Sequence, residues 1–236
     1  MIFVVVPTYN ERDNLPRLVD ALLRIAHVNV LVVDDGSPDG TGEAADRLAA
    51  SSDGRVQVLH RSGQRGLGRS YIDGFQHVLR LGATRVCQMD ADFSHDPNDV
   101  PRLLEATESA DLAIGSRYVP GGTLHNWPWH RVVLSAFANR YVRTITGIPV
   151  HDATSGFRCW RAELLARVPL PRIVSEGYAF QVEMAWHASL SGARIVEVPI
   201  RFVERLHGAS KLSGQVILES AILPWRLRLA APQKTR

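Results

Sequence analysis

The sequence predicts an α/β fold in which a mostly parallel β-sheet carries helices on both faces. Two observations support this prediction. Short apolar runs rich in Val and Ile alternate with longer segments whose apolar residues recur at helical spacing, in the order βαβαβαβ. The runs are apolar at nearly every position, which is typical of strands buried on both faces of a parallel sheet. The pattern therefore indicates a doubly wound, Rossmann-like sheet in a single main domain.

The elements of the first half follow one another without long loops. The expected strands are Ile2–Val6, Val28–Val33, Arg55–His60, Thr84–Met89 and Leu112–Gly115. The expected helices are Asn14–Ile25, Thr41–Ala50, Leu67–Leu81 and Pro97–Thr107. The last helix has a clear start signal, because Asp96 is a suitable N-cap and Pro97 suits the first helical position.

The second half is less periodic. Loops are expected around Gly121-Gly122 and Trp127–Trp129 and a polar stretch over Asp152–Arg158; the expected regular elements are helices over Val132–Thr146 and Phe180–Ser191 and a strand over Ile195–Phe202. No internal repeat or low-complexity linker is evident. We expect a main domain over residues 1–211 and a C-terminal amphipathic segment over residues 212–236. That segment mixes apolar residues with Arg226 and Arg228, and the pattern fits a membrane-surface element and a helix packed on the core equally well.

Composition excludes several classes of protein. A chain of 236 residues, 45% of them hydrophobic, can bury one sizeable core. The two cysteines fit neither a disulfide framework nor a thiolate metal site, which favours a reducing, cytoplasmic setting. We expect no signal peptide and no spanning helix, because no segment reaches about 18 consecutive apolar residues.

The charge pattern bears on the kind of ligand. The net charge of +3 comes from basic residues dispersed along the chain, without the clusters that a nucleic-acid groove needs. Small phosphorylated ligands or an anionic membrane surface are the expected partners.

The residues after the strands are the ones to inspect for chemistry, because open α/β sheets bind ligands beyond the carboxyl ends of their strands. Here these positions are unusually polar. They are Pro7–Glu11, Asp34–Gly40, Gly63–Gly68 and Asp90–Asp92.

Asp90 and Asp92 flank Ala91 at the end of an apolar strand. Two carboxylates placed so closely in a desolvated position repel each other unless a cation neutralises them. Mg²⁺ or Mn²⁺ suits this role, because such ions bridge one or two carboxylates to substrate phosphates. A bound ion would stabilise charge on a departing diphosphate. The alternative is a solvated, Asp-rich turn.

The other loops favour a nucleotide ligand. Asp34-Asp35 could accept hydrogen bonds from a base or ribose, although the same residues could simply form a turn before a helix. Gly63–Gly68 matches neither the dinucleotide-binding nor the P-loop pattern, and neither a hydrolase elbow nor a zinc-protease motif is present. Arg117, Arg131, Arg205 and Lys211 are candidate phosphate ligands.

Taken together, these motifs resemble those of inverting family-2 glycosyltransferases, and within them those of the polyprenol (dolichol) phosphate mannose synthases. The resemblance covers nearly the whole chain. It rests on Pro7–Glu11, Val33–Thr41, Asp90–Asp92 with Ser94-His95, Gly115–Tyr118, Asp152–Arg158, Gly177-Tyr178 with Phe180-Gln181 and Glu183, and Arg205–Lys211.

The resemblance implies a GT-A type fold and a role for each matching residue. The guanosine of GDP-mannose would contact Pro7, Tyr9, Glu11, Val33 and Asp35. Asp90, Ala91 and Asp92 would hold the diphosphate through Mg²⁺ or Mn²⁺, with Ser94 as a further metal ligand where some relatives have Gln. Arg205 and Lys211 would close over the diphosphate, while Arg117 and Arg131 would face the phosphate of a polyprenyl acceptor.

The resemblance further implies a reaction and a location. Asp92, Arg117 and Arg131 would be the catalytic residues of mannose transfer to a polyprenyl monophosphate, with inversion. The enzyme would act at the cytoplasmic face of a membrane, bound to the surface directly or through a membrane-anchoring protein partner. Two alternatives stay open: another donor such as UDP-glucose or a non-lipid acceptor, and a non-catalytic nucleotide-sugar-binding subunit of a membrane glycosylation complex.

Overall fold

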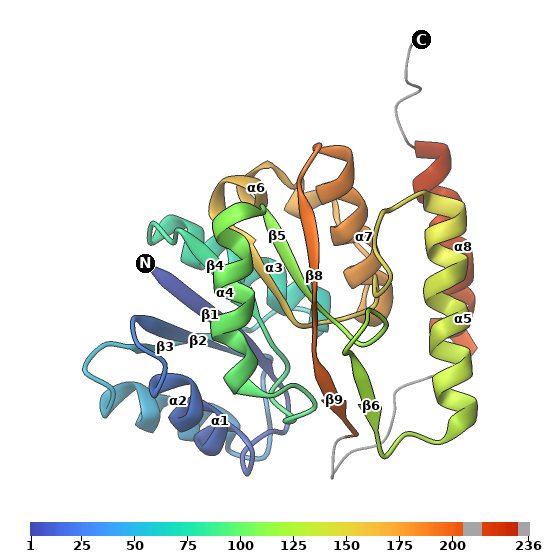
Figure 1. The fold of residues 1–236 in the computed structure, drawn as a ribbon. Coiled ribbons are helices and arrows are strands. Elements are labelled where there is room, and N and C mark those ends of the chain that lie inside the picture. Colours follow the sequence, from blue (N-terminus) through green and yellow to red (C-terminus); the bar gives the residue numbers. More distant parts are fainter. Residues whose placement is uncertain (205–213, 231–236) are drawn as a thin grey trace.

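The computed structural model describes residues 1–204 and 214–230, with the side chains of residues 214–220 left aside. Its centre is a seven-stranded sheet in the order β3-β2-β1-β4-β7-β5-β8, with β6 and β9 forming a separate two-stranded sheet (Figure 1). The strands are β1 Ile2–Thr8, β2 Val28–Asp34, β3 Val56–His60, β4 Arg85–Gln88, β5 Leu112–Ser116, β6 Thr123–His125, β7 Arg158–Arg161, β8 Ile195–Pro199 and β9 Arg201–Val203.

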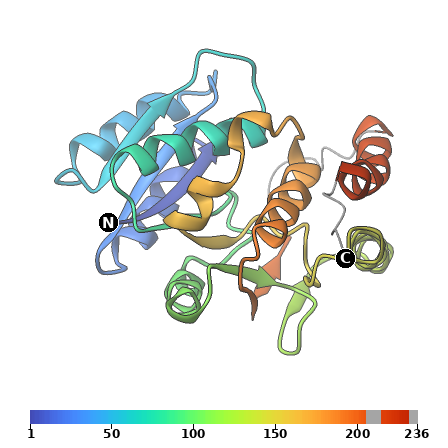
Figure 2. The same cartoon turned by 90° about the horizontal axis from the view of Figure 1, so that it is seen from above.

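Helices cover both faces of the large sheet, as the sequence predicts (Figure 2). One apolar cluster includes residues of α1, α2 and α4, and the other includes residues of α3, α6 and α7. The helices are α1 Leu15–Leu23, α2 Thr41–Ala50, α3 Leu67–Arg80, α4 Val100–Ser109, α5 Trp129–Thr146, α6 Ala162–Arg167, α7 Gly177–Leu190 and α8 Gly214–Ala230, with short 3₁₀ turns at Pro97–Asp99 and Leu170–Arg172.

The sheet is mixed because β7 runs antiparallel between β4 and β5, whereas β1, β2, β3 and β4 pair in parallel and β5 pairs in parallel with β8. β7 brings Cys159 directly opposite Cys87 of β4, and both cysteines are free and buried. A hydrogen bond between the two thiols, together with burial, raises the pKa of Cys87 well above its ordinary value.

The expected single strand over Ile195–Phe202 is wrong, because the segment divides into two strands at Ile200. Pro199 ends β8, and its missing backbone N–H suits a strand end. The chain then continues as β9, which pairs with β6 outside the large sheet. This division lets the chain leave the sheet beside the carboxyl end of β5.

Helix α3 lies very close to the central strands. A β-carbon on Gly74 would lie 2.7 Å from Cγ1 of Val5 and 3.0 Å from Cγ2 of Val33. A glycine at this position therefore permits the close approach, and with it the placement of the amino-terminal end of α3 beside the strand ends.

The C-terminal helix α8 packs beside α5 and α7 at one side of the molecule (Figures 1 and 2). Leu223 and Leu227 are buried, and the indole nitrogen of Trp225 donates a hydrogen bond of 2.9 Å to the hydroxyl of Tyr141. Leu229 is 84% exposed on the same helix. The helix thus has both a packed side and an apolar exposed side. Within residues 1–204 and 214–230, no helix combines the length and apolar character that crossing a bilayer requires.

Candidate active site

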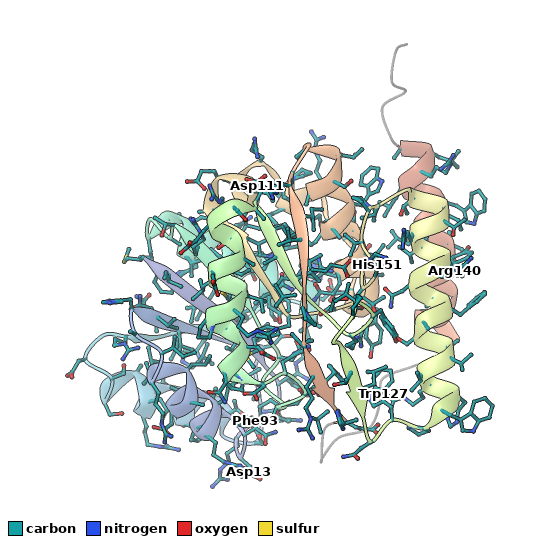
Figure 3. All side chains as sticks on the ribbon, in the orientation of Figure 1. Asp13, Phe93, Asp111, Trp127, Arg140 and His151 are labelled. Carbon is teal, nitrogen blue, oxygen red and sulfur yellow. The ribbon has the colours of Figure 1, made fainter. Side chains whose placement is uncertain are left out.

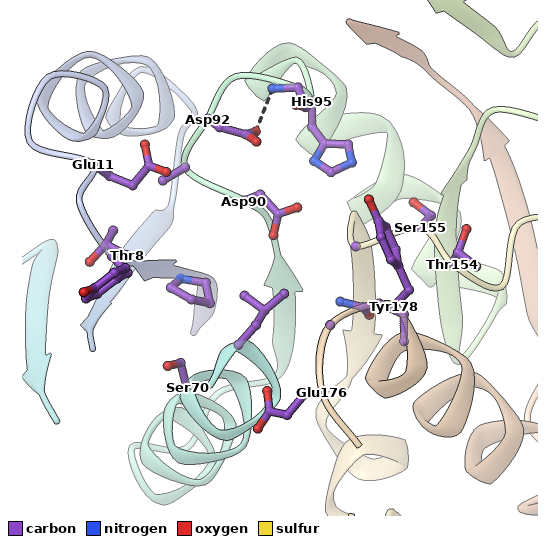
Figure 4. Close-up of a pocket in the computed structure, with 18 of the residues that line it drawn as sticks. Thr8, Glu11, Ser70, Asp90, Asp92, His95, Thr154, Ser155, Glu176 and Tyr178 are labelled. Carbon is purple, nitrogen blue, oxygen red and sulfur yellow. Dashed lines mark hydrogen bonds between the residues drawn. The ribbon is translucent and has the colours of Figure 1, made fainter. Parts of the chain in front are cut away.

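A cavity of about 560 Å³ opens at the carboxyl ends of β1 and β4. It is bounded by the loops after these strands, the start of α3, the start of α7 and the segment around Thr154–Gly156. Figure 4 shows Asp90 and Asp92 on the loop after β4, with Glu11 on one side and Tyr178 on the other. The cavity therefore lies at the edge of the sheet that the sequence pattern singles out.

The carboxylates of Asp90 and Asp92 are each held by a hydrogen bond. The hydroxyl of Tyr71 donates to Oδ1 of Asp90 over 3.0 Å, and the backbone N–H of Ser94 donates to Oδ1 of Asp92 over 3.0 Å. Phe93, which lies between Asp92 and Ser94 in the chain, has a φ of 58°, a left-handed conformation that is uncommon for a large side chain. This turn places Asp92 and Ser94 on the same cavity wall.

The donor set at this end fits a hard divalent cation. Asp90, Asp92 and Ser94 all line the cavity and all offer oxygen, the ligand atom that Mg²⁺ and Mn²⁺ favour. Across the described part of the chain, no three His, Cys, Asp or Glu side chains gather into a complete metal cage. The residues suit an ion that keeps waters or takes further ligands from a substrate, and the metal-ligand assignments stay predictions.

The predicted nucleotide-binding residues divide into two groups. Pro7, Tyr9, Glu11 and Asp35 line the cavity, whereas Val33 is fully buried in the core. Ala91 lies between the two aspartates and also lines the cavity.

Asp35 is fixed by neighbours that the sequence analysis did not identify. Its carboxylate forms an ion pair with Arg61 and accepts a hydrogen bond of 2.8 Å from the backbone N–H of Gly66. Arg65 donates to the hydroxyl of Tyr9 over 2.7 Å, and its guanidinium carbon lies 4.7 Å from the centre of the Tyr9 ring. The loop after β3 thus positions the carboxylate of Asp35 and places the positive charge of Arg65 over the ring of Tyr9.

Arg117 is buried and lines the same cavity. Its Nε and Nη2 donate to the two carboxylate oxygens of Asp152 over 2.7 and 2.6 Å, and Nη2 also donates to Thr154 over 2.8 Å. Although burial opposes the charged form, the ion pair with Asp152 keeps the pKa of Arg117 above its ordinary value. Arg117 is therefore a fixed, permanently charged group.

Arg131 lies near Arg117. Its guanidinium carbon is 4.6 Å from the centre of the Trp127 ring, and that of Arg117 is 5.7 Å from the same ring. Arg131 also forms an ion pair with Glu204. Figure 3 places Trp127 beside β6 and β9, which carry this corner of the cavity. The two arginines that the sequence proposes as a pair are thus brought together on one aromatic side chain.

Two further titratable groups line the cavity. His95 is buried between the rings of Phe157 and Phe202, and burial lowers its pKa to about 4, so the imidazole is neutral at physiological pH. Glu176 accepts a hydrogen bond of 2.8 Å from the backbone N–H of Gly68 at the start of α3. Burial raises the pKa of Glu176 above its ordinary value.

Arg205 and Lys211 lie outside the described residues, so their predicted contacts with a diphosphate stay predictions. Several cavity residues escaped the sequence analysis as site residues. Arg65, Trp127 and Phe202 are among them, whereas Tyr178 and Gln181 belong to the motifs on which the resemblance rests. A polar loop after β3 was the available signal for Arg65, whereas Trp127 and Phe202 lie beside or within the paired strands β6 and β9, whose pairing the sequence pattern did not predict.

The mixed α/β sheet with a cavity and a carboxylate pair at its strand ends is the arrangement that the GT-A resemblance implies. Residues 3–168 match the family described as glycosyl transferase family 2. The chain belongs to this family and is an enzyme of the glycosyltransferase class.

Two relatives are similar over almost their whole length. The chain is 50% identical over 232 residues to a polyprenol monophosphomannose synthase of Mycolicibacterium smegmatis, covering 95% of this chain and 86% of that protein. It is 48% identical over 234 residues to an undecaprenyl-phosphate mannosyltransferase of Micrococcus luteus, covering 98% of this chain and 95% of that protein.

More distant solved structures share the fold. Glucosyl-3-phosphoglycerate synthase from Mycobacterium tuberculosis, in complex with Mn²⁺, UDP and phosphoglyceric acid, aligns with a TM-score of 0.70 at 19% identity, covering 99% of this chain and 80% of that chain. A mannosyltransferase from Pyrobaculum calidifontis, in complex with GDP-Man and Mn²⁺, aligns with a TM-score of 0.57 at 16% identity, covering 98% of this chain and 73% of that chain.

Proposed function

We propose that this enzyme transfers mannose from GDP-mannose to a polyprenyl monophosphate and forms polyprenyl phosphate β-mannose. The names of the two close relatives support the sugar and the lipid acceptor. The structural observation that carries the proposal is the arrangement of charged groups in one cavity: it is lined by the carboxylates of Asp90 and Asp92 and also by the guanidinium groups of Arg117 and Arg131, each of which is paired with a carboxylate.

The part of the cavity around the two aspartates suits the donor. Asp90 and Asp92, with Ser94 beside them, would hold Mg²⁺ or Mn²⁺, which neutralises the charge of the diphosphate when bound. Tyr9 offers an aromatic face for the base, and Arg65 lies over that face in the structure. A nucleotide would therefore run from the Tyr9–Arg65 pair toward the two aspartates.

The part of the cavity around the two arginines suits a phosphate acceptor. Arg117 and Arg131 can grip phosphate oxygens, and the fixed position of Arg117 would orient the phosphate without further ordering. A phosphate monoester has a second pKa of about 6 and is largely dianionic at neutral pH, so its oxygen needs no general base.

The chemical step then requires only alignment. An oxygen of the acceptor phosphate attacks the anomeric carbon from the side opposite the diphosphate. A new carbon–oxygen bond forms while the bond to the diphosphate breaks, and the electron pair leaves with GDP. Inversion converts the α-linked donor into a β-linked product, and the arginines hold the attacking phosphate in line.

An exposed apolar face beside the arginines supports access to a lipid. Trp129 and Phe137 of α5 are 77% and 66% exposed, and Val133 and Leu134 on the same helix are also exposed. Arg131 belongs to the first turn of this helix, so a lipid whose phosphate reaches Arg131 would pass along α5. Exposed Trp225 and Leu229 of the adjacent α8 extend the face.

We propose that this face lies on the cytoplasmic surface of a membrane, directly or with the help of a membrane-anchoring protein partner. Arg140 lies on α5 and supplies positive charge for anionic lipid headgroups (Figure 3). An amphipathic pair of helices at a membrane surface would deliver the acceptor without a spanning segment.

The test is a transfer assay with the purified full chain. GDP-mannose labelled in the sugar, a polyprenyl phosphate in detergent or vesicles, and Mg²⁺ or Mn²⁺ should yield an acid-labile glycolipid. A parallel assay uses UDP-glucose labelled in the sugar. Transfer from UDP-glucose but not from GDP-mannose would show that the proposed donor is wrong. The absence of a lipid product under every donor and metal combination would contradict the proposal, and Asp92→Asn should abolish the reaction.

The same variant separates an enzyme from a non-catalytic subunit. Cells that depend on this chain should lose function when they carry Asp92→Asn, because the carboxylate is needed for turnover. Full complementation by Asp92→Asn would favour the non-catalytic alternative.

A further inference from the structure

Three buried side chains form a hydrogen-bonded relay that ends at the cavity. Trp160 of β7 donates from its indole nitrogen to Oε1 of Gln88 over 2.9 Å, and Nε2 of Gln88 donates to Oε1 of Gln181 over 2.8 Å. Trp160 and Gln88 are 0% exposed and Gln181 is 3% exposed. Of the three, Gln181 lines the cavity. The relay thus runs from the sheet interior to the wall of the active site.

The chemistry of the indole fixes the direction of every bond in this relay. The Trp160 nitrogen can only donate, so Gln88 must turn its amide oxygen toward it. The amide nitrogen of Gln88 then faces Gln181, which must accept the hydrogen bond with its own amide oxygen. The remaining group of Gln181, the Nε2 amide, carries two N–H donors and is the end turned away from Gln88. A buried donor-only residue therefore sets the polarity of a residue on the cavity wall.

This amide nitrogen lies close to the carboxylate of Asp90, a predicted metal ligand. A β-carbon on Gly156 would lie 3.5 Å from Nε2 of Gln181 and 3.3 Å from Oδ2 of Asp90. The missing side chain of Gly156 therefore leaves a small space that is bordered by an amide donor on one side and a carboxylate on the other. A ligand atom entering this space beside Gln181 should be an oxygen that accepts a hydrogen bond.

We infer that Gln181 is a substrate-binding residue that donates a hydrogen bond to an oxygen of the nucleotide sugar, and that Trp160 and Gln88 are positioning residues that fix it as a donor. This inference rests on the proposed function, because it assumes that a nucleotide sugar occupies the cavity. The oxygen belongs either to a hydroxyl of the transferred sugar or to the diphosphate.

The test compares the binding of GDP and GDP-mannose, each with Mn²⁺, to the full chain by isothermal titration calorimetry. Gln181→Met keeps the length of the side chain and removes the donor. We expect its affinity for GDP-mannose to fall about tenfold. An unchanged affinity for GDP would assign the oxygen to the sugar, and an equal loss for both ligands would assign it to the diphosphate.

Two further variants separate binding from folding. Gln76→Met of α3, whose side chain does not line the cavity, should bind both ligands as the wild type does. Trp160→Phe removes the indole donor and frees the two amides to turn over, so it should weaken GDP-mannose binding severalfold, less than Gln181→Met does. Thermal unfolding of each variant with and without ligand reports whether the fold is retained.

Unchanged binding of both ligands by a folded Gln181→Met variant would overturn the inference. Full wild-type affinity in Trp160→Phe, alongside weakened Gln181→Met, would overturn the positioning role of the relay. A wild-type chain that binds UDP-glucose and not GDP-mannose would contradict the proposed donor instead, and the same comparison would then use UDP and UDP-glucose.

Discussion

Tyr71 and Asp90 are joined by a hydrogen bond of 3.0 Å from the phenol hydroxyl to the carboxylate Oδ1. Tyr71 is fully buried, and its ring stacks on Phe180 with centroids 5.8 Å apart. Burial, followed by the charge of Asp90, raises the pKa of Tyr71 well above its ordinary value, so the phenol stays a donor. The buried phenol of Tyr71, on α3, therefore holds the carboxylate of Asp90 in place.

Tyr71→Phe should weaken metal binding while preserving the fold, because the ring remains and only the donor to Asp90 is lost. Losing a hydrogen bond to a metal-binding carboxylate costs roughly 10-fold or more in affinity. Titration of Mn²⁺, with free ion followed by electron paramagnetic resonance, measures the change. Tyr141→Phe, which removes a hydroxyl at the contact with α8, serves as the control and should bind Mn²⁺ normally. Equal affinity in both variants would remove Tyr71 from the metal-site argument.

The buried ion pair between Arg117 and Asp152 makes a second prediction, on stability. Asp152→Ala leaves a buried guanidinium without its counter-charge and should lower the free energy of unfolding by roughly 3–5 kcal/mol. Replacing both partners, as Arg117→Met with Asp152→Leu, should recover much of this loss because no charge is then stranded. Urea denaturation of the single and double variants tests this. A double variant no more stable than Asp152→Ala would show that the pair acts through shape alone.

Gly74→Ala tests the close approach of α3 to the sheet. Alanine favours a helix by about 1 kcal/mol over glycine, but the new methyl group would press on Val5 and Val33, and overpacking costs about 1–3 kcal/mol. We expect the packing cost to win and the melting temperature to fall. Gly63→Ala, where nothing lies within 4 Å of the new atom, is the matched control and should leave stability almost unchanged. A Gly74→Ala variant that is more stable than the wild type would contradict this packing.

The exposed face of α5 makes a prediction about membranes. Phe137→Ser should reduce sedimentation of the protein with vesicles containing anionic lipid, because burying a phenylalanine is worth about 1.5–3 kcal/mol. Leu190→Ser removes an exposed apolar side chain of α7 and should have little effect. Transfer to a short, water-soluble polyprenyl phosphate should survive in both variants. Undiminished vesicle binding by Phe137→Ser would place the membrane contact elsewhere.

The first half of the fold could be predicted from the sequence because its signals are local. Apolar runs mark β1 and β2, and α2 begins and ends at the residues expected for it. The short strand β7 could not be predicted in this way. Its sequence, Arg158–Arg161, carries arginines at both ends, and it becomes a strand through pairing with β4 and β5 rather than through its own pattern.

In the candidate site, too, the residues marked by local sequence signals could be predicted, and the contacts made by tertiary packing could not. Asp90 and Asp92 were predictable because they follow a strand directly and carry a recognisable chemistry. The ion pairs of Asp35 with Arg61 and of Arg117 with Asp152 were not, because their partners are 26 and 35 residues apart and are brought together by tertiary packing. In the relay that ends at Gln181, the hydrogen bond from Gln88 to Gln181 joins residues that are 93 positions apart. Only the fold brings these two residues together.

The facing cysteines in the middle of the sheet have a practical consequence. Cys87 and Cys159 are buried, and the raised pKa of Cys87 keeps its sulfur in the unreactive thiol form. They are the two cysteines of the sequence, so the natural chain should stay silent toward maleimide reagents while it is folded. A cysteine introduced on an exposed face, for example at Leu229, would then accept a fluorophore or spin label selectively, without first stripping the protein of its native thiols.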